Sequence, residues 1–188
     1  TVIVAGAAGL LAGAVSMAAG EYVSVKAEAE LVERELDIER QSLAEDPIEE
    51  TEELASIYMS RGLDPKQARD LAGAVMADPD VALEVHAREE LGVDPDSVGD
   101  PMGAAVSSFG AFSVGAILPL IPWFLAEGWG AVIASVVLGL LASAAVGWGL
   151  AHFTERSKVR TAGRQVLIAA VACTITYAIG SAVGVAVG

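Results

Sequence analysis

The chain alternates between long apolar runs and one polar block. Four uncharged or nearly uncharged runs cover roughly residues 1–20, 102–126, 128–152 and 165–187. Each run has the length of about twenty residues that a helix needs to cross the hydrocarbon layer of a bilayer. Backbone groups within lipid must be hydrogen-bonded inside their own segment, which favours helices over strands. The pattern predicts an all-α membrane protein, a transmembrane helical bundle with an inserted acidic helical module.

The polar block at residues 21–100 has a helical pattern of its own. Residues 21–45 contain no proline and continue directly from the first apolar run. Asp64 and Pro65 form a helix start, because an aspartate caps the first turn and proline fits the first helical position. The helices expected in the block are 21–45, 48–61, one beginning at Pro65, and 80–91. We therefore divide the chain into a span at 1–20, a module at 21–100 and three spans at 101–188.

The charge is confined to the polar block. Residues 21–100 hold 23 acidic residues against seven basic ones, a net charge of −16, whereas the rest of the chain carries +2. This balance argues against nucleic acid as a partner, because phosphates require basic side chains. The single cysteine, Cys173, lies in the last apolar run and cannot form an intrachain disulfide or a thiolate metal cluster. An acidic module joined to membrane spans indicates a protein that handles cations.

The basic residues of the spans predict the orientation. The hinge at 154–164 contains Arg156, Lys158, Arg160 and Arg164, whereas the hinge at 126–129 has no base. Basic hinges remain on the cytosolic side of a membrane. Alternation of the spans then places the acidic module in the cytosol as well. Two prolines, at positions 119 and 122, predict a kink in the second run.

Five side chains of the module lie where an ionised or polar group is costly. They are Glu39, Glu50, Glu53, His86 and Glu90. Residues three or four positions apart share a helix face, which pairs Glu50 with Glu53 and His86 with Glu90. Ionised groups between packed helices need a counter-charge, and the seven bases are few. A divalent cation supplies it, and carboxylates with an imidazole suit Fe²⁺, Mn²⁺ or Zn²⁺ better than Ca²⁺.

Three stretches resemble the vacuolar iron transporter family. They are GlyAlaValSerMetAlaAlaGlyGluTyrValSerVal at 13–25, AlaArgGluGluLeuGly at 87–92 and LeuProLeuIlePro at 118–122, within a resemblance that covers essentially the whole chain. The resemblance implies five spans, a homodimer, and a cytosolic metal-binding module between the second and third spans. It also implies exchange of Fe²⁺ or Mn²⁺ for protons. The first run here would be the family's second span, so we expect a further span, carrying a transport aspartate, upstream of Thr1.

The resemblance also assigns residues. The family's membrane methionine falls on Met17, and its module ligands fall on Glu39, Glu50, Glu53 and Glu90. The chain departs from the family at Ser42, which replaces a module carboxylate, at His86 and Ala87, which replace two methionines, and at Gly9, which replaces a membrane carboxylate. His86 can take over as a ligand, but Ser42 is a weaker one. The module is therefore expected to bind fewer metal ions than the family's.

These features predict a transporter, not an enzyme. We expect export of Fe²⁺ or Mn²⁺ from the cytosol in exchange for protons, with no cofactor, with a homodimer in the bilayer, and with Zn²⁺ as a further ion the module can bind. The membrane would be a bacterial inner membrane, or a vacuolar membrane in a eukaryote. One alternative is a membrane-anchored di-iron carboxylate oxidase, although such folds place Glu-x-x-His on two helices. The other is a scaffold protein that transports nothing.

Overall fold

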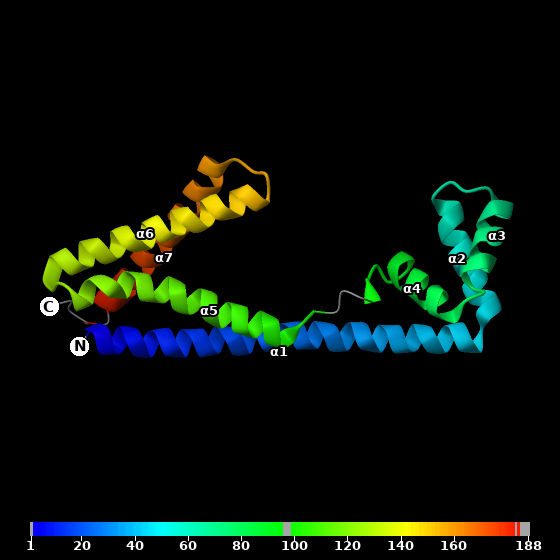
Figure 1. The fold of residues 1–188 in the computed structure, drawn as a ribbon, viewed down its shortest axis with the longest axis horizontal. Coiled ribbons are helices and arrows are strands. Elements are labelled where there is room, and N and C mark those ends of the chain that lie inside the picture. The colour runs from blue at the N-terminus through cyan, green and yellow to red at the C-terminus, as the bar shows by residue number, and fades with distance from the viewer. Residues whose placement is uncertain (1, 96–98, 183, 185–188) are drawn as a thin grey trace. The chain divides into compact units, whose positions relative to one another are not determined.

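The computed structural model describes residues 2–95, 99–182 and 184, and within these residues it contains helices and turns but no strand. Figure 1 shows the elements in chain order. They are α1 (Val2–Glu45), α2 (Pro47–Ser60), α3 (Pro65–Val75), α4 (Pro79–Glu89), α5 (Pro101–Leu120), the 3₁₀ helix η2 (Ile121–Phe124), α6 (Gly128–Phe153) and α7 (Lys158–Ala182). The predicted all-α fold class is confirmed.

Four helical segments are long and apolar enough to cross a membrane. They are Val2–Glu45, Pro101–Phe124, Gly128–Phe153 and Lys158–Ala182. The last helix begins at Lys158 rather than at residue 165, because lysine and arginine are good helix formers and a helix does not stop where its apolar run stops. Residues 183 and 185–187 of the predicted run lie outside the described residues. The chain is an integral membrane protein.

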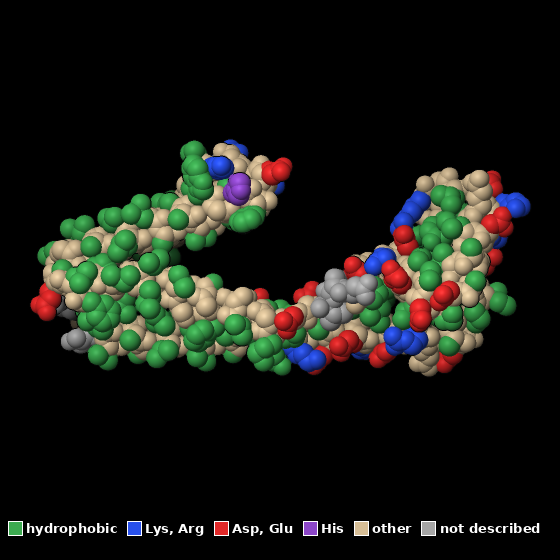
Figure 2. Space-filling model, in the orientation of Figure 1, with side chains coloured by type: hydrophobic (Ala, Val, Ile, Leu, Met, Phe, Trp, Pro, Cys, Tyr) green, Lys and Arg blue, Asp and Glu red, His purple; other side chains and the backbone are tan. Residues whose placement is uncertain are grey.

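Two compact units make up the chain, and α1 contributes to both. One comprises Thr1–Ala18 with Val106–Gly188, and is called the membrane unit below. The other comprises Ala19–Ala105, and is called the module. Figure 2 shows mainly hydrophobic side chains on the drawn face of the apolar helices, whereas acidic and basic side chains are interspersed over the module helices.

The membrane unit is built on close helix approach. A Cβ atom on Gly147 of α6 would lie 2.7 Å from the Cα of Ala162 in α7, so a larger residue would push these helices apart. Next to the two prolines, α5 ends at Leu120 and the chain continues as the 3₁₀ helix η2. Pro119 lies inside α5, and the hydroxyl of Ser135 in α6 donates a 2.6 Å hydrogen bond to the Pro119 carbonyl. That bond satisfies a backbone group close to the interrupted ladder.

The module has a small core between α2 and α3. Leu54 and Ala55 of α2 are buried against Ala68 and Ala72 of α3. Aspartates cap the short helices as expected, since Asp64 accepts from the Lys66 N–H at 2.9 Å and Asp78 accepts from the Asp80 N–H at 3.0 Å. The helix predicted for 80–91 spans Pro79–Glu89. These caps fix the directions in which α3 and α4 leave their turns.

Candidate metal centre

Four side chains of the module converge on one point. Glu39 of α1, Glu50 of α2, and His86 and Glu90 from the last turn and C-cap of α4 each offer a ligand atom, and these atoms lie within 4.8 Å of one another. His86 is fully buried, Glu39 is 6% exposed, Glu50 is half-buried and Glu90 lies at the exposed edge. The group therefore opens to solvent on the side of Glu90.

The His86 ring is the centre of the group. Its Nδ1 atom lies 3.0 Å from Glu39 Oε1, 3.4 Å from Glu90 Oε2 and 3.6 Å from Glu50 Oε2. The contact with Glu39 Oε1 is close but does not have hydrogen-bond geometry, since this buried oxygen has no hydrogen-bond partner among the described residues. The buried Nε2 atom of His86 also has none among them. The ring is thus held by packing and by the carboxylates around Nδ1.

The spacing suits a small divalent cation. A metal with bonds of about 2.1 Å holds two ligands about 3.0 Å apart at a right angle and about 3.4 Å apart at a tetrahedral angle. The distances from Nδ1 to Glu39 and to Glu90, 3.0 and 3.4 Å, match these two values, and the distance to Glu50, 3.6 Å, is slightly longer. Three carboxylates and one imidazole form a mixed oxygen and nitrogen donor set, which Fe²⁺, Mn²⁺ and Zn²⁺ accept.

The carboxylates are electrostatically frustrated without a cation. Burial raises the pKa of Glu39 above its usual value, and repulsion from Glu90 and Glu50 raises it further, while His86 lowers it. Burial is also the main reason that the pKa of Glu50 is raised, partly offset by His86. A protonated imidazole would bring one positive charge against three carboxylates. The group would therefore remain negative even with His86 charged.

No lysine or arginine of the module compensates this charge. Each of its seven bases forms an ion pair with an acid outside the group: Lys26 with Glu30, Arg34 with Glu35, Arg40 with Asp37, Arg61 with Glu89, Lys66 with Asp70, Arg69 with Glu52, and Arg88 with Glu84 and Asp94. Leaving a buried charge without a partner is strongly destabilising. A cation bound at the group would remove that cost.

Two candidate ligands lie outside the group. Glu53 is exposed on α2 and does not belong to the four, although its charge helps to raise the pKa of Glu39 and Glu50. Met17 lies on the α1 segment that belongs to the membrane unit, where it is 49% exposed. The described residues around Met17 include no His, Cys, Asp or Glu group able to hold a metal with it.

One contact that positions the group was not expected from the sequence. Arg61, the C-cap residue of α2, forms an ion pair with Glu89 at the end of α4, next to the ligand Glu90. Burial of Tyr58 beside Glu89 raises the pKa of the Tyr58 hydroxyl. The pair links the two helices that supply Glu50, His86 and Glu90. Nothing in the local pattern around either residue indicates this pairing, because the two are far apart in the chain.

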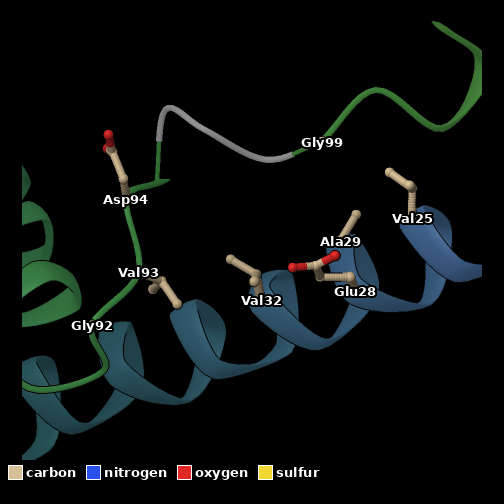
Figure 3. A pocket seen from close by; sticks show the side chains of 8 residues that line it. All are labelled: Val25, Glu28, Ala29, Val32, Gly92, Val93, Asp94 and Gly99. Atoms are coloured by element: carbon tan, nitrogen blue, oxygen red, sulfur yellow. The ribbon is translucent and has the colours of Figure 1, made fainter. Parts of the chain in front are cut away.

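A second hollow of the module has a different character. Val25, Glu28, Ala29 and Val32 of α1 line one side of a cavity of about 300 Å³, opposite a segment that includes Val93 and Asp94 (Figure 3). The carboxylate of Asp94 points away from α1 in this view and pairs with Arg88. The lining combines aliphatic side chains and glycines with the acids Glu28 and Asp94, and it contains none of the four converging side chains. Among the described residues this lining does not form a group of side chains that could hold a metal ion.

Comparison with known proteins finds sequence similarity over almost the whole chain. A sequence model described as the VIT family matches residues 1–181. The chain is 39% identical to a vacuolar iron transporter of Acanthamoeba castellanii, over 95% of this chain and 68% of the relative. It is 33% identical to vacuolar iron transporter 1 of Eucalyptus grandis, over 97% and 74% of the two chains. It is 32% identical to vacuolar iron transporter 1 of Arabidopsis thaliana, over 97% of this chain and 73% of the relative.

Proposed function

The chain belongs to the VIT family and is a membrane protein that transports metal ions; from this premise we propose that it moves Fe²⁺ or Mn²⁺ out of the cytosol in exchange for protons. The relatives are named as iron transporters, and none of these names describes an enzyme. The di-iron oxidase and the inert scaffold are therefore set aside. The observation that carries the proposal is the convergence of Glu39, Glu50, His86 and Glu90.

In the proposed mechanism the module captures the cation first. Its net negative charge raises the local concentration of cations, as charged clefts do for their ligands. The open edge at Glu90 admits the ion, and the buried Glu39 and His86 hold it. Glu53 contributes by its charge and Glu50 by direct ligation. The same donor set suits Zn²⁺. We therefore expect the module to bind Zn²⁺ as well, although the proposed cargo is Fe²⁺ or Mn²⁺.

Protons are displaced when the metal binds. Carboxylates must lose their protons before they ligate a metal, so metal binding and proton release are linked. The raised pKa of Glu39 and of Glu50 increases the fraction of these groups that is protonated in the metal-free state. A more acidic compartment on the far side would oppose return of the metal and would supply protons for the exchange.

Within the membrane we propose Met17 as a ligand of the passing ion. A thioether is a soft donor, which favours Fe²⁺ over the harder Mg²⁺ and Ca²⁺. Small residues such as Gly13 accompany Met17 on α1 and permit close approach of the helices, since the Gly13 position is in tight contact with Phe112 of α5. We also propose a homodimer, with the module on the cytosolic side of a bacterial inner membrane or a vacuolar membrane.

The test is metal uptake by proteoliposomes that contain the full chain. Anaerobic Fe²⁺ entry is followed with a quenched internal dye, with and without an imposed pH gradient. The variant Glu50→Ala/Glu90→Ala should lose at least about tenfold in initial rate at low Fe²⁺, the scale typical of lost metal-site groups. Glu33→Ala/Glu52→Ala is the matched control, because both of these acids are exposed and lie outside the group.

Three results would contradict the proposal. Equal rates for both variants would mean that the module does not capture the transported ion. Transport of Mg²⁺ as fast as Fe²⁺ would mean that the Met17 thioether and the His86 imidazole do not select the transported ion. Rates that do not respond to the pH gradient, with no internal pH change during uptake, would exclude proton exchange while leaving metal transport intact.

A further inference from the structure

The turn between α6 and α7 carries several basic side chains that have no acidic partner among the described residues. Arg156, Lys158, Arg160 and Arg164 lie within nine residues, with Glu155 as the acid of the segment 154–164. No ion pair joins any of these four bases to an acid among the described residues, and all four are exposed. We call these four residues the basic hinge. It differs from the module, where each of the seven bases has an acidic partner.

The turn that presents the hinge is well fixed. Thr154 ends α6, with its N–H 3.0 Å and its hydroxyl 2.8 Å from the Leu150 carbonyl. The Arg156 N–H donates to the Ala151 carbonyl at 3.1 Å, and the intervening Glu155 has a positive φ of 51°. Just inside the turn Gly147 brings α6 against α7. The cationic side chains therefore project from an end of the hairpin that is held by these backbone hydrogen bonds.

Large apolar side chains surround the basic hinge. Phe153 is 85% exposed and Val159 is 79% exposed. Trp148 is half-exposed, and the Lys158 ammonium lies 5.2 Å from the centre of its ring. Figure 2 shows basic, acidic, histidine and hydrophobic side chains together at this end of the α6–α7 hairpin. Aromatic rings at the ends of membrane helices lie at the level of lipid headgroups.

We propose that the basic hinge is a binding site for the phosphate of an anionic phospholipid, whose acyl chains pack on Phe153 and Val159. Four cations beside exposed apolar groups match both parts of such a lipid. Clusters of lysine and arginine next to a membrane helix attract anionic headgroups, and the attraction falls off within a Debye length. The other hinge, at 126–129, exposes Trp129 but has no base, so one end of the membrane unit alone would select these lipids.

The test uses the full chain in a neutral detergent. Thermal unfolding is followed as a phosphatidylglycerol is added, and in parallel a phosphatidylcholine with the same acyl chains. Phosphatidylglycerol should raise the unfolding temperature at concentrations at least about tenfold below those required for phosphatidylcholine, and raising NaCl from about 0.05 M to about 0.5 M should remove this preference. Inorganic phosphate and glycerol phosphate should produce no shift at the same concentrations.

Substitutions locate the site. Arg156→Gln/Arg160→Gln/Arg164→Gln should abolish the preference, whereas the same positions changed to lysine should retain it. The matched control, Lys26→Gln/Arg34→Gln/Arg40→Gln, changes the net charge equally within the module and should behave as wild type. Equal shifts with both lipids would overturn the proposal, as would an unaffected glutamine triple variant or a control that loses the preference. A shift with inorganic phosphate alone would replace the lipid by a free anion. If the glutamine variant does not fold, the lipid and salt comparisons on the wild-type chain decide the outcome.

Discussion

The Nδ1 atom of His86 lies 3.0 Å from Oε1 of Glu39, although His86 belongs to the last turn of the short helix α4 and Glu39 to the long helix α1. Both side chains are buried, and among the residues that the structure describes no lysine or arginine forms an ion pair with Glu39. A carboxylate facing an imidazole nitrogen in this way, with two further carboxylates within 3.6 Å of the same nitrogen, is an arrangement that a cation stabilises.

Removing a central carboxylate should cost more than removing a peripheral one. Glu39→Gln deletes a buried member of the group and should weaken Mn²⁺ binding at least about tenfold. Glu53→Gln should weaken it less, because Glu53 acts on the group through its charge alone. Isothermal titration of the full chain in detergent measures both, with Glu33→Gln as an exposed control. An equal loss for Glu39→Gln and Glu53→Gln would mean that burial does not distinguish the ligands.

The metal-free chain should become less stable as pH rises. The pKa of Glu39 is raised from 4.5 in the folded chain, mainly by burial, so the folded state binds more protons than the unfolded state above that value. The contribution of Glu39 to stability then falls as pH increases from about 4.5 through the raised pKa, and this contribution is constant on either side of the window. Glu39→Gln should flatten the decline and raise the metal-free unfolding temperature at pH 7, while metal binding weakens.

Thermal unfolding monitored by circular dichroism in the presence of a chelator measures this effect. Adding Mn²⁺ to wild type at pH 7 should restore the stability that is lost on deprotonation, since a ligand that binds the folded state stabilises it. Glu33→Gln serves again as the control and should follow the wild-type curve. A metal-free wild type that gains stability between pH 5 and pH 7 would have the opposite sign, and would show that other groups dominate.

Replacing Gly147 of α6 by alanine should destabilise the chain, whereas the same change at the nearby Gly149 should not. A Cβ at position 147 would lie 2.7 Å from the Ala162 Cα, whereas a Cβ at position 149 meets nothing within 4 Å. Gly147→Ala should destabilise the chain by about 1–3 kcal/mol, the usual cost of overpacking. Gly149→Ala should be neutral or slightly stabilising. Unfolding temperatures in detergent compare the two, and equal values would refute the tight α6–α7 contact.

A membrane-impermeant thiol reagent should label the module and the basic hinge from the same side of the membrane. In a Cys173→Ser background, single cysteines at Ser56 of the module and at Ser157 should be labelled from the same side of the membrane. A cysteine at Glu127, in the hinge without bases, should be labelled from the opposite side. Labelling is measured in intact cells and in inverted vesicles. Ser56→Cys and Ser157→Cys with opposite accessibility would require a different number of crossings between them.

Local patterns in the sequence determined the helices of this protein. Apolar runs of span length require helices whatever surrounds them, because lipid offers no hydrogen-bond partners. Aspartates at positions 46, 64 and 78, each followed by proline, start the module helices through contacts with their own first turns. Helical spacing alone also placed Glu50 and Glu53 on one side of α2, and His86 and Glu90 on one side of α4.

Only the tertiary structure decided which of these faces meet. Glu50 and Glu53 are equivalent by spacing, yet the end of α4 reaches Glu50 and leaves Glu53 exposed. The contact of His86 with Glu39 and the pairing of Arg61 with Glu89 depend on how the turns direct α2 and α4, which are joined through α3. Helix periodicity repeats every few residues and carries no information about such distant partners. Burial of His86, and with it the raised pKa of Glu39, arises from that packing.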